Sequence, residues 1–144
     1  MKITEALLAE HVVFHNLFDH VEKVAPNLQK LGEVRSLARL LEHLLAAHSA
    51  IEDEFLIAPL EHCFDQLGQR DTFHQEHKDI ERHLAQAQTS RRLTQARRSL
   101  LDAVLASRKH FDKEERLVFP MAEKLLSQHT LTRLGHRWVS IGCA

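Results

Sequence analysis

The chain has 144 residues, enough for one domain with a buried core, and its 44% hydrophobic and 27% charged residues are ordinary for a soluble globular protein. A net charge of −1 argues against a nucleic-acid-binding role, which normally needs a concentrated basic face, and no stretch is apolar enough to predict a membrane span. Two cysteines, Cys63 and Cys143, are too few for a disulfide framework, and the N-terminal segment lacks the apolar run of a signal peptide. We therefore expect a reduced, cytoplasmic setting.

Two features of the composition stand out. The chain has only four Gly and three Pro, and it is rich in Leu, Ala, Glu, Gln, Arg and Lys, which are good helix formers. These facts predict an all-α protein. The chain also has 12 His, and because histidine is a common metal ligand, the excess directs attention to where these side chains lie.

The first predicted helix runs from about residue 4, capped by Thr4, to about residue 25, where Pro26 and Asn27 stop it. Its inward positions recur every three or four residues and are Leu7, Leu8, His11, Phe14, His15 and Phe18. The second predicted helix spans about residues 33 to 57, and Pro59 is expected to bend or end it. Its inward positions are Leu37, Leu41, Leu44, Leu45, His48, Ile51, Glu52 and Phe55.

A third helix is predicted from Asp71, as its cap, to about residue 87, with Phe73, His77, Ile80 and Leu84 inward. A fourth opens at Ser90 and carries Leu93, Leu100, Val104, His110, Glu114 and Leu117 before Pro120. Residues 121–144 are expected to add one or two short helical pieces around Trp138. Four long helices with short connections predict an antiparallel up-down four-helix bundle over about residues 4–126, with a C-terminal extension at 127–144, in a single domain spanning 1–144.

A pattern of histidines and acids occurs twice along the chain. Glu10-His11 on the first helix precedes His48-x-x-x-Glu52-Asp53 on the second, and Glu76-His77 on the third precedes His110-x-x-x-Glu114-Glu115 on the fourth. A His and a Glu four residues apart lie on the same face of a helix, so both can lean toward one point in the bundle. A single His-x-x-x-Glu is weak evidence, and His77/Glu81 is a third example. The repeated arrangement is specific, because it places one such cluster on every helix.

The position of this pattern within the apolar stripes predicts a metal. Burying four imidazoles and two carboxylates without partners would cost several kcal/mol per group. Divalent or trivalent cations would neutralise the glutamates and take the imidazole lone pairs, which turns that cost into binding energy. Mixed imidazole and carboxylate ligands suit non-haem iron, with zinc or manganese as possible substitutes.

The combined pattern over about residues 4 to 126 resembles the hemerythrin-like, HHE cation-binding domain family. The resemblance implies a four-helix bundle around an oxo- or hydroxo-bridged di-iron centre. It implies terminal ligands at His11, His48, His77 and His110, bridging ligands at Glu52 and Glu114, and a position open to dioxygen, nitric oxide, peroxide or water.

The chain departs from the oxygen-carrying hemerythrins at two positions. Those proteins have a second histidine four residues before the third-helix ligand, where this chain has Phe73, and an aspartate five residues after the fourth-helix histidine, where it has Glu115. Fewer imidazoles and more carboxylates favour the ferric state, which argues against reversible oxygen carriage.

Other residues have two possible interpretations at this stage. His15, His74 and Glu81 each lie one helical turn from a predicted ligand, so each is either an additional ligand or a residue outside the metal shell. Glu10, Glu76 and Asp53 flank the ligands and are expected to face solvent or to support a ligand from behind. The remaining histidines are expected at the surface or between helices, and the phenylalanines in the core.

The pattern predicts a di-iron protein that binds or senses dioxygen, nitric oxide or peroxide, or that takes part in iron homeostasis or a redox stress response. The small ligand and an unknown redox partner are the expected partners, with no nucleic acid and no membrane. One alternative is a di-iron oxidase or peroxidase. Ferritin-like enzymes of that kind use Glu-x-x-His, which this chain lacks, and no separate nucleophile or acid–base pair emerges. The other alternative is a metal-free helical interaction module.

Overall fold

The computed structural model describes residues 1–67 and 70–142, and none of them lies in a β-strand. Seven α-helices follow one another: α1 (Ile3–Val24), α2 (Leu31–Glu52), α3 (Ala58–Leu67), α4 (Arg70–Thr89), α5 (Leu93–Lys113), α6 (Phe119–Leu125) and α7 (Gln128–Gly142). A 3-10 turn, Ala25–Asn27, follows α1. Two π-helical turns, Asp53–Ile57 and Glu114–Val118, join α2 to α3 and α5 to α6. The expectation of an all-helical chain is confirmed for these residues.

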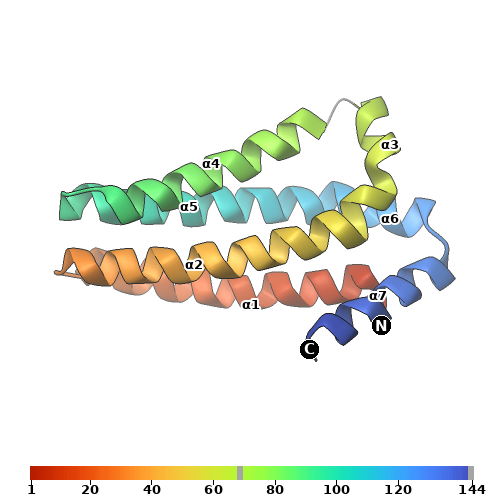
Figure 1. Ribbon diagram of the computed structural model, residues 1–144, viewed down its shortest axis with the longest axis horizontal. Coiled ribbons are helices and arrows are strands. Elements are labelled where there is room, and N and C mark those ends of the chain that lie inside the picture. The colour runs from red at the N-terminus through yellow and green to blue at the C-terminus, as the bar shows by residue number, and fades with distance from the viewer. Residues whose placement is uncertain (68–69, 143–144) are drawn as a thin grey trace.

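Four of the helices are long and lie side by side along the long axis of the molecule (Figure 1). Helix α4 packs against α5 and α2, and α1 packs against α5. Helix α7 crosses the N-terminal part of α1 as a fifth packed helix, so the expected C-terminal helical extension is present. In general outline the arrangement fits a four-helix bundle.

The interior consists of two apolar clusters. One lies between the long helices and includes Phe18, Leu41 and Leu100, and the other lies toward α3, α6 and α7 and includes Leu7, Phe55 and Leu131. Burial of both follows from the helical spacing of apolar residues, as on α2, whose buried residues are Val34, Ala38, Leu41, Leu45, His48 and Glu52. The last two of these are polar. They lie where the two apolar clusters meet.

The helix direction changes next to Pro59, where the sequence predicted that the second helix bends or ends: α2 stops at Glu52, and α3 turns away from it after the π-turn (Figure 1). The chain continues as helix to Leu67, and Pro59 is the second residue of α3, directly after the π-turn. Pro120 has the same place in α6, directly after the other π-turn. A π-turn inserts one residue into the helix and loosens its hydrogen-bond ladder, which gives the proline ring room and makes its missing N–H tolerable.

The π-turns also explain why one residue that was predicted to face the interior is exposed. Leu117 was expected to face inward, but it is 49% exposed and Val118 is fully buried instead. The inserted residue rotates the following positions by about one step of the helix, so the inward face moves on by one residue. Leu8 and Leu44 were also expected to face the interior but are exposed. The buried face of α1 and of α2 covers fewer positions than a spacing of three or four residues suggested.

Three helix starts differ from the prediction. Thr4 lies within the first turn of α1, behind the N-cap Lys2, and its hydroxyl donates to Glu123. Asp71 likewise lies inside the first turn of α4. Helix α5 begins at Leu93, after Ser90. Cap residues can be shifted by a turn because a side chain such as Thr4 finds a partner on another helix, which local sequence does not reveal.

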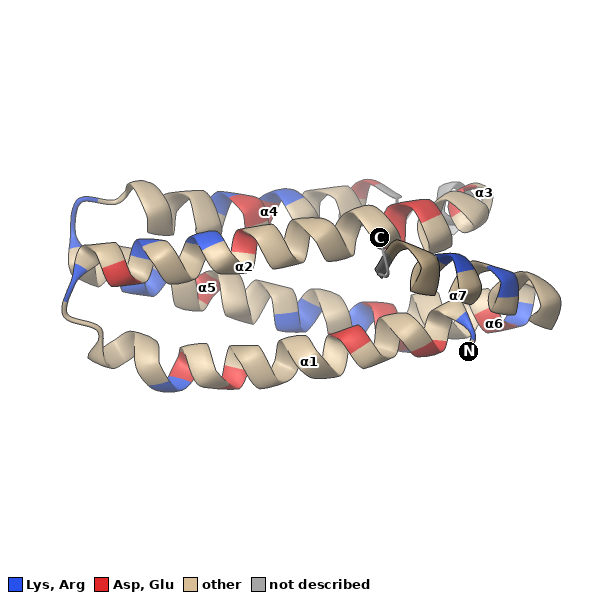
Figure 2. Ribbon diagram, turned by 60° about the horizontal axis from the view of Figure 1, so that its bottom comes forward, with Lys and Arg blue, Asp and Glu red and all other residues tan. Residues whose placement is uncertain are grey.

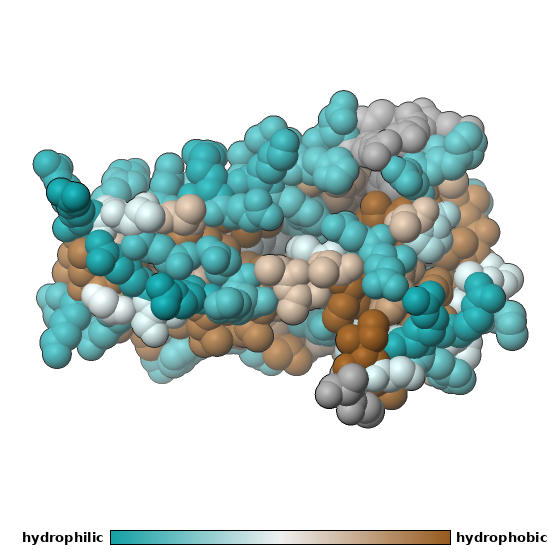
Figure 3. Space-filling model, in the orientation of Figure 1, coloured by the Kyte–Doolittle hydropathy of each residue, from teal (hydrophilic) through white to brown (hydrophobic). Residues whose placement is uncertain are grey.

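The surface is mixed in charge. Lysine and arginine alternate with aspartate and glutamate along the helices (Figure 2). The face in Figure 3 is mainly hydrophilic, with apolar side chains gathered over α7, where Val139 and Ile141 are exposed. Among the described helices, none combines the length and the apolar character that crossing a membrane requires.

Candidate metal centre

The six predicted ligands come together inside the bundle. His11 is on α1, His48 and Glu52 on α2, His77 on α4, His110 on α5, and Glu114 at the start of the π-turn after α5. Five of the six side chains are buried, and His77 is partly exposed. These residues form two groups of metal-ligating atoms, each with all its atoms within 4.8 Å of one another.

The first group contains His11, His48, Glu52 and Glu114. The Nε2 atoms of His11 and His48 are 3.3 Å apart, and His48 Nε2 is 3.1 Å from Glu52 Oε2. Glu114 Oε2 is 4.0 Å from His11 Nε2. Four donor atoms therefore converge from three different helical segments.

The second group contains Glu52, His77 and His110. The Nε2 atoms of the two histidines face each other at 2.7 Å. His110 Nε2 is also 2.7 Å from Glu114 Oε1. Glu52 thus belongs to both groups, and Glu114 lies within 4.0 Å of a histidine of each group.

Buried atoms without hydrogen bonds show that a cation fits this donor set. Both carboxylate oxygens of Glu114 and Oε1 of Glu52 are buried without a well-aligned hydrogen bond. The facing Nε2 atoms of His77 and His110 can share only one proton between them. A buried acceptor without a donor costs free energy, and a cation bound among these atoms would remove that cost.

The two glutamates have opposite pKa shifts. Burial and the nearby charge of Glu52 raise the pKa of Glu114 well above its usual value. Burial also acts to raise the pKa of Glu52, but hydrogen bonds with Glu114 and His48 outweigh it and lower that pKa to about 2. The two buried carboxylates therefore cannot both be charged at low cost, so the pair holds a proton in the metal-free protein.

The histidines of the first group also differ from each other. Burial, reinforced by the charge of His48, lowers the pKa of His11 to about 3. Burial likewise acts to lower the pKa of His48, but the carboxylates of Glu10 and Glu52 outweigh it and raise the pKa to about 9. His11 is thus neutral and ready to bind a metal at pH 7, whereas His48 must first lose a proton.

Carboxylates lie behind two of the candidate ligand histidines, on the side away from the cluster. Glu76 Oε2 is 2.7 Å from Nδ1 of His110, and Glu10 Oε2 is 3.4 Å from Nδ1 of His48. Each Glu-His dipeptide therefore provides a ligand on its own helix and a carboxylate for the ligand of the next helix. Such outer carboxylates fix the ring orientation and increase the basicity of a ligand histidine.

The π-turns lie at the two buried glutamates of the site. Glu52 is the last residue of α2 and Glu114 is the first residue of the second π-turn. Because π-turns are often found at functional sites, they support a role for this point in both halves. The π-turns were not predicted from the sequence, although the proline that follows each glutamate by six or seven residues is a usable signal.

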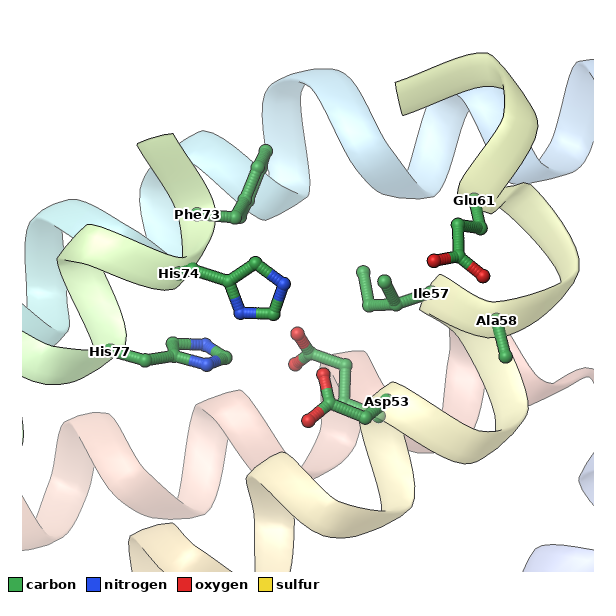
Figure 4. A pocket seen from close by; sticks show the side chains of 8 residues that line it. Asp53, Ile57, Ala58, Glu61, Phe73, His74 and His77 are labelled. Atoms are coloured by element: carbon green, nitrogen blue, oxygen red, sulfur yellow. The ribbon is translucent and has the colours of Figure 1, made fainter. Parts of the chain in front are cut away.

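The residues left open by the sequence lie outside the two groups. Nδ1 of His15 is 2.9 Å from Nη1 of Arg108, which donates to it. Glu81 is exposed. His74 is exposed as well and lines a cavity beside His77 (Figure 4).

The phenylalanines expected in the core, Phe14, Phe18, Phe55, Phe73, Phe111 and Phe119, are all buried. Cys63 is a free thiol, and Cys143 lies outside the described residues.

The structure is thus that of a helical protein with a candidate metal site, which four imidazoles and two carboxylates form between the helices. Comparison with known proteins makes this class more specific. Residues 68–136 match the family model described as the Hemerythrin HHE cation binding domain, so the predicted resemblance is confirmed. The matched segment includes His77, His110 and Glu114, and cation binding is what its description names. No curated protein and no solved structure matches the chain.

Proposed function

We propose that the whole chain is one hemerythrin-like domain that binds two iron ions as a non-haem di-iron protein. The observation that carries the proposal is the membership of Glu52 in both groups of ligand atoms, with Glu114 in contact with a histidine of each. Two metal positions that share carboxylates explain why the pattern occurs twice in the sequence. In this proposal His11 and His48 hold one metal, and His77 and His110 hold the other.

The proposed activity is binding or sensing of dioxygen, nitric oxide or peroxide, in iron homeostasis or a redox stress response. The bound irons would supply the redox chemistry and the position for a small ligand. The chain supplies the rest. Its imidazoles and carboxylates set the charge of the site, Glu10 and Glu76 orient two of the histidines, and the surrounding phenylalanine rings exclude water from the His11 side.

The proposal includes two further features of the protein. One is the antiparallel up-down order of the four long helices, which their short connections favour. The other is a cytoplasmic location, where the reduced thiol of Cys63 would persist. Enzymatic turnover by the centre is not part of the proposal, because no nucleophile or acid–base pair separate from the ligands has been identified.

Elemental analysis with an absorption spectrum tests the proposal. We expect about two irons per chain in protein produced with ample iron, with oxo-to-iron charge-transfer bands in the near ultraviolet. Glu52→Ala and Glu114→Ala should each lose most of the metal, and His129→Ala, an exposed control, should lose none. A Glu52→Ala protein with full iron content would contradict the ligand assignment, and wild-type protein without metal would favour the metal-free interaction module.

A further inference from the structure

A cavity connects the surface of the bundle with the candidate metal centre. It has a volume of about 260 Å³ and lies between α4 on one side and the π-turn Asp53–Ile57 with α3 on the other (Figure 4). Glu52 and His77, two of the six candidate ligands, are part of its lining. Glu52 is only 1% exposed, and its Oε1 atom has no well-aligned hydrogen bond. The inner end of the cavity therefore offers a buried oxygen that lacks a donor.

Three further side chains that can bind a metal line the outer part of this cavity. Asp53, in the π-turn, and Glu61, on α3, have carboxylates, and His74, on α4, has an imidazole. All three residues are exposed, and their side chains point into the space between α4 and α3 in Figure 4. None of the described residues that line the cavity is Lys or Arg. Its polar lining therefore consists of oxygen and nitrogen donors with a net negative charge, which attracts a divalent cation.

Asp53 lies where the cavity meets a groove on the same face of the bundle. The groove has a volume of about 590 Å³ and lies between α2 and α4, and both Asp53 and His77 border it as well as the cavity. Glu42 and Glu81 add two acids to the lining of the groove. A cation drawn to this face of the protein therefore meets Asp53 from either direction.

The other sides of the centre are less suited to the passage of a cation. The ring of His11 stacks on Phe111 with centroids 3.9 Å apart, and carbon atoms cannot replace the water that a cation must lose. On α5, Nζ of Lys113 is 3.0 Å from Glu76 and brings a positive charge close to the centre. A second cavity, between the start of α1 and α6, also has acids in its lining but none of the six candidate ligands.

We propose that the cavity between α4 and α3 is where the metal enters the protein. Asp53, Glu61 and His74 take a divalent cation from solvent and pass it to the candidate ligands at the inner end. This inference rests on the proposed di-iron function, since it names the route by which the centre is filled. Taking a divalent cation out of water without new ligands costs much free energy. A series of donors lowers that cost, because each donor replaces a bound water in turn.

The three entry residues hold the cation only in passing. Among the described residues, the two compact groups of ligand atoms include neither Asp53, Glu61 nor His74. Water must therefore complete the coordination of a cation at the entry, whereas the buried groups offer four and three donors within a few ångströms. The entry residues should consequently control the rate of metal uptake and leave the amount bound at equilibrium unchanged.

Removal of two entry residues is the first test. Asp53→Asn and His74→Gln are combined in one variant, and Co²⁺ is mixed with the metal-free protein while its visible absorption is followed. We expect uptake to be slower than in the wild type by about tenfold or more, with the same number of cobalt ions bound per chain at the end. The control combines Glu54→Gln and His129→Gln, two exposed residues that do not line the cavity, and it should match the wild type.

The outcomes of this test separate the inference from the proposed function. An unchanged uptake rate in the variant of Asp53 and His74 would overturn the inference. Fewer cobalt ions at equilibrium would overturn it as well, because the two residues would then be permanent ligands of the centre. Wild-type protein that binds neither cobalt nor iron would instead refute the proposed function itself.

A positive charge at the mouth of the cavity is the second test, and it leaves every donor in place. Ala58 is exposed and lines the cavity, so Ala58→Arg should slow Co²⁺ uptake by about fivefold or more at low salt, and added salt should reduce the difference. Ala47→Arg adds the same charge at an exposed position of α2 outside the cavity lining and should have little effect. Equal rates in the two variants would show that net charge, and not this cavity, governs uptake, and would refute the inference.

Discussion

At the scale of single residues, the centre depends on pairs of acids and histidines that act between neighbouring helices. Glu76 lies 2.7 Å from Nδ1 of His110 through its Oε2. Its other oxygen, Oε1, accepts a hydrogen bond from Nζ of Lys113 at 3.0 Å. Glu10 lies behind His48 and accepts a hydrogen bond from Nε1 of Trp138 at 3.3 Å. Each supporting carboxylate is therefore fixed by a second donor, which limits the rotation of the ligand ring in front of it.

Removing the charge of a supporting carboxylate should weaken metal binding without removing a ligand. Glu76→Gln is expected to lower iron affinity by roughly tenfold to a hundredfold, because the amide cannot orient His110 or raise its basicity as well. Competition with a chelator measures the change, and Glu81→Gln, an exposed acid on the same helix, is the control. Identical affinities in the two variants would show that Glu76 has no such role.

The protonation of His48 makes metal uptake depend on pH. Its pKa in the metal-free protein is raised to about 9, so at pH 7 it carries a proton that a metal must displace. Iron affinity should therefore rise with pH up to about 9 and fall on acidification, with protons released on binding at pH 7. Calorimetry in two buffers of different ionisation enthalpy counts those protons. Heats that do not depend on the buffer would contradict this assignment.

At the scale of elements, the π-turns and the docking of α7 shape the end of the bundle near the centre. The π-turns lie directly before the helices that contain Pro59 and Pro120, and Glu52 and Glu114 beside these turns are buried. Helix α7 packs across α1, and Gly135 lies directly against the backbone of Met1, where a Cβ atom would collide. Leu131 and Leu134 are buried on the same face of α7. This docking holds Trp138 near Glu10.

A side chain at position 135 should therefore loosen α7. We expect Gly135→Ala to lower the stability by roughly 1–3 kcal/mol, because the backbone of Met1 cannot yield as a flexible side chain would. Thermal unfolding measures the effect. Gly32→Ala is the matched control, since nothing lies within 4 Å of the added Cβ atom, and it should be neutral or slightly stabilising. Equal melting temperatures in the two variants would show that α7 is not tightly docked.

At the scale of the whole molecule, the buried polar groups of the candidate metal centre lower the stability of the metal-free fold. The buried oxygens of Glu114 interrupt the junction of two apolar clusters and lack well-aligned hydrogen bonds. Such groups destabilise the metal-free fold, whereas a bound metal stabilises the folded state, the more so the more tightly it binds. A structural ion pair would behave in the opposite way, since its removal would destabilise the protein whether or not metal is present.

Glu114→Gln separates these possibilities. In chelator-treated protein, the variant should be more stable than the wild type by about 1 kcal/mol or more, because the amide is neutral without the proton that the buried pair of Glu52 and Glu114 must otherwise take up. In iron-loaded samples the order should reverse, because the variant loses a bridging ligand. Denaturant unfolding with and without iron measures both differences. A variant that is less stable in both conditions would argue for a purely structural glutamate.

Much of this protein follows from the sequence by itself. The helical composition and the spacing of apolar residues determined the all-helical fold, and the doubled Glu-His and His-x-x-x-Glu pattern identified the six residues that meet in the interior. Local sequence is sufficient here because ligands four residues apart necessarily lie on one helix face. Whether these six residues bind iron stays a prediction.

Only the tertiary structure decided which atoms face each other across the helices. It paired Glu10 with His48 and Glu76 with His110, directed His15 toward Arg108, and opened a cavity beside His77. It also placed a π-turn between α2 and α3, directly before Pro59. These features depend on the rotation and tilt of whole helices, which the packing of distant side chains sets and which no short stretch of sequence encodes.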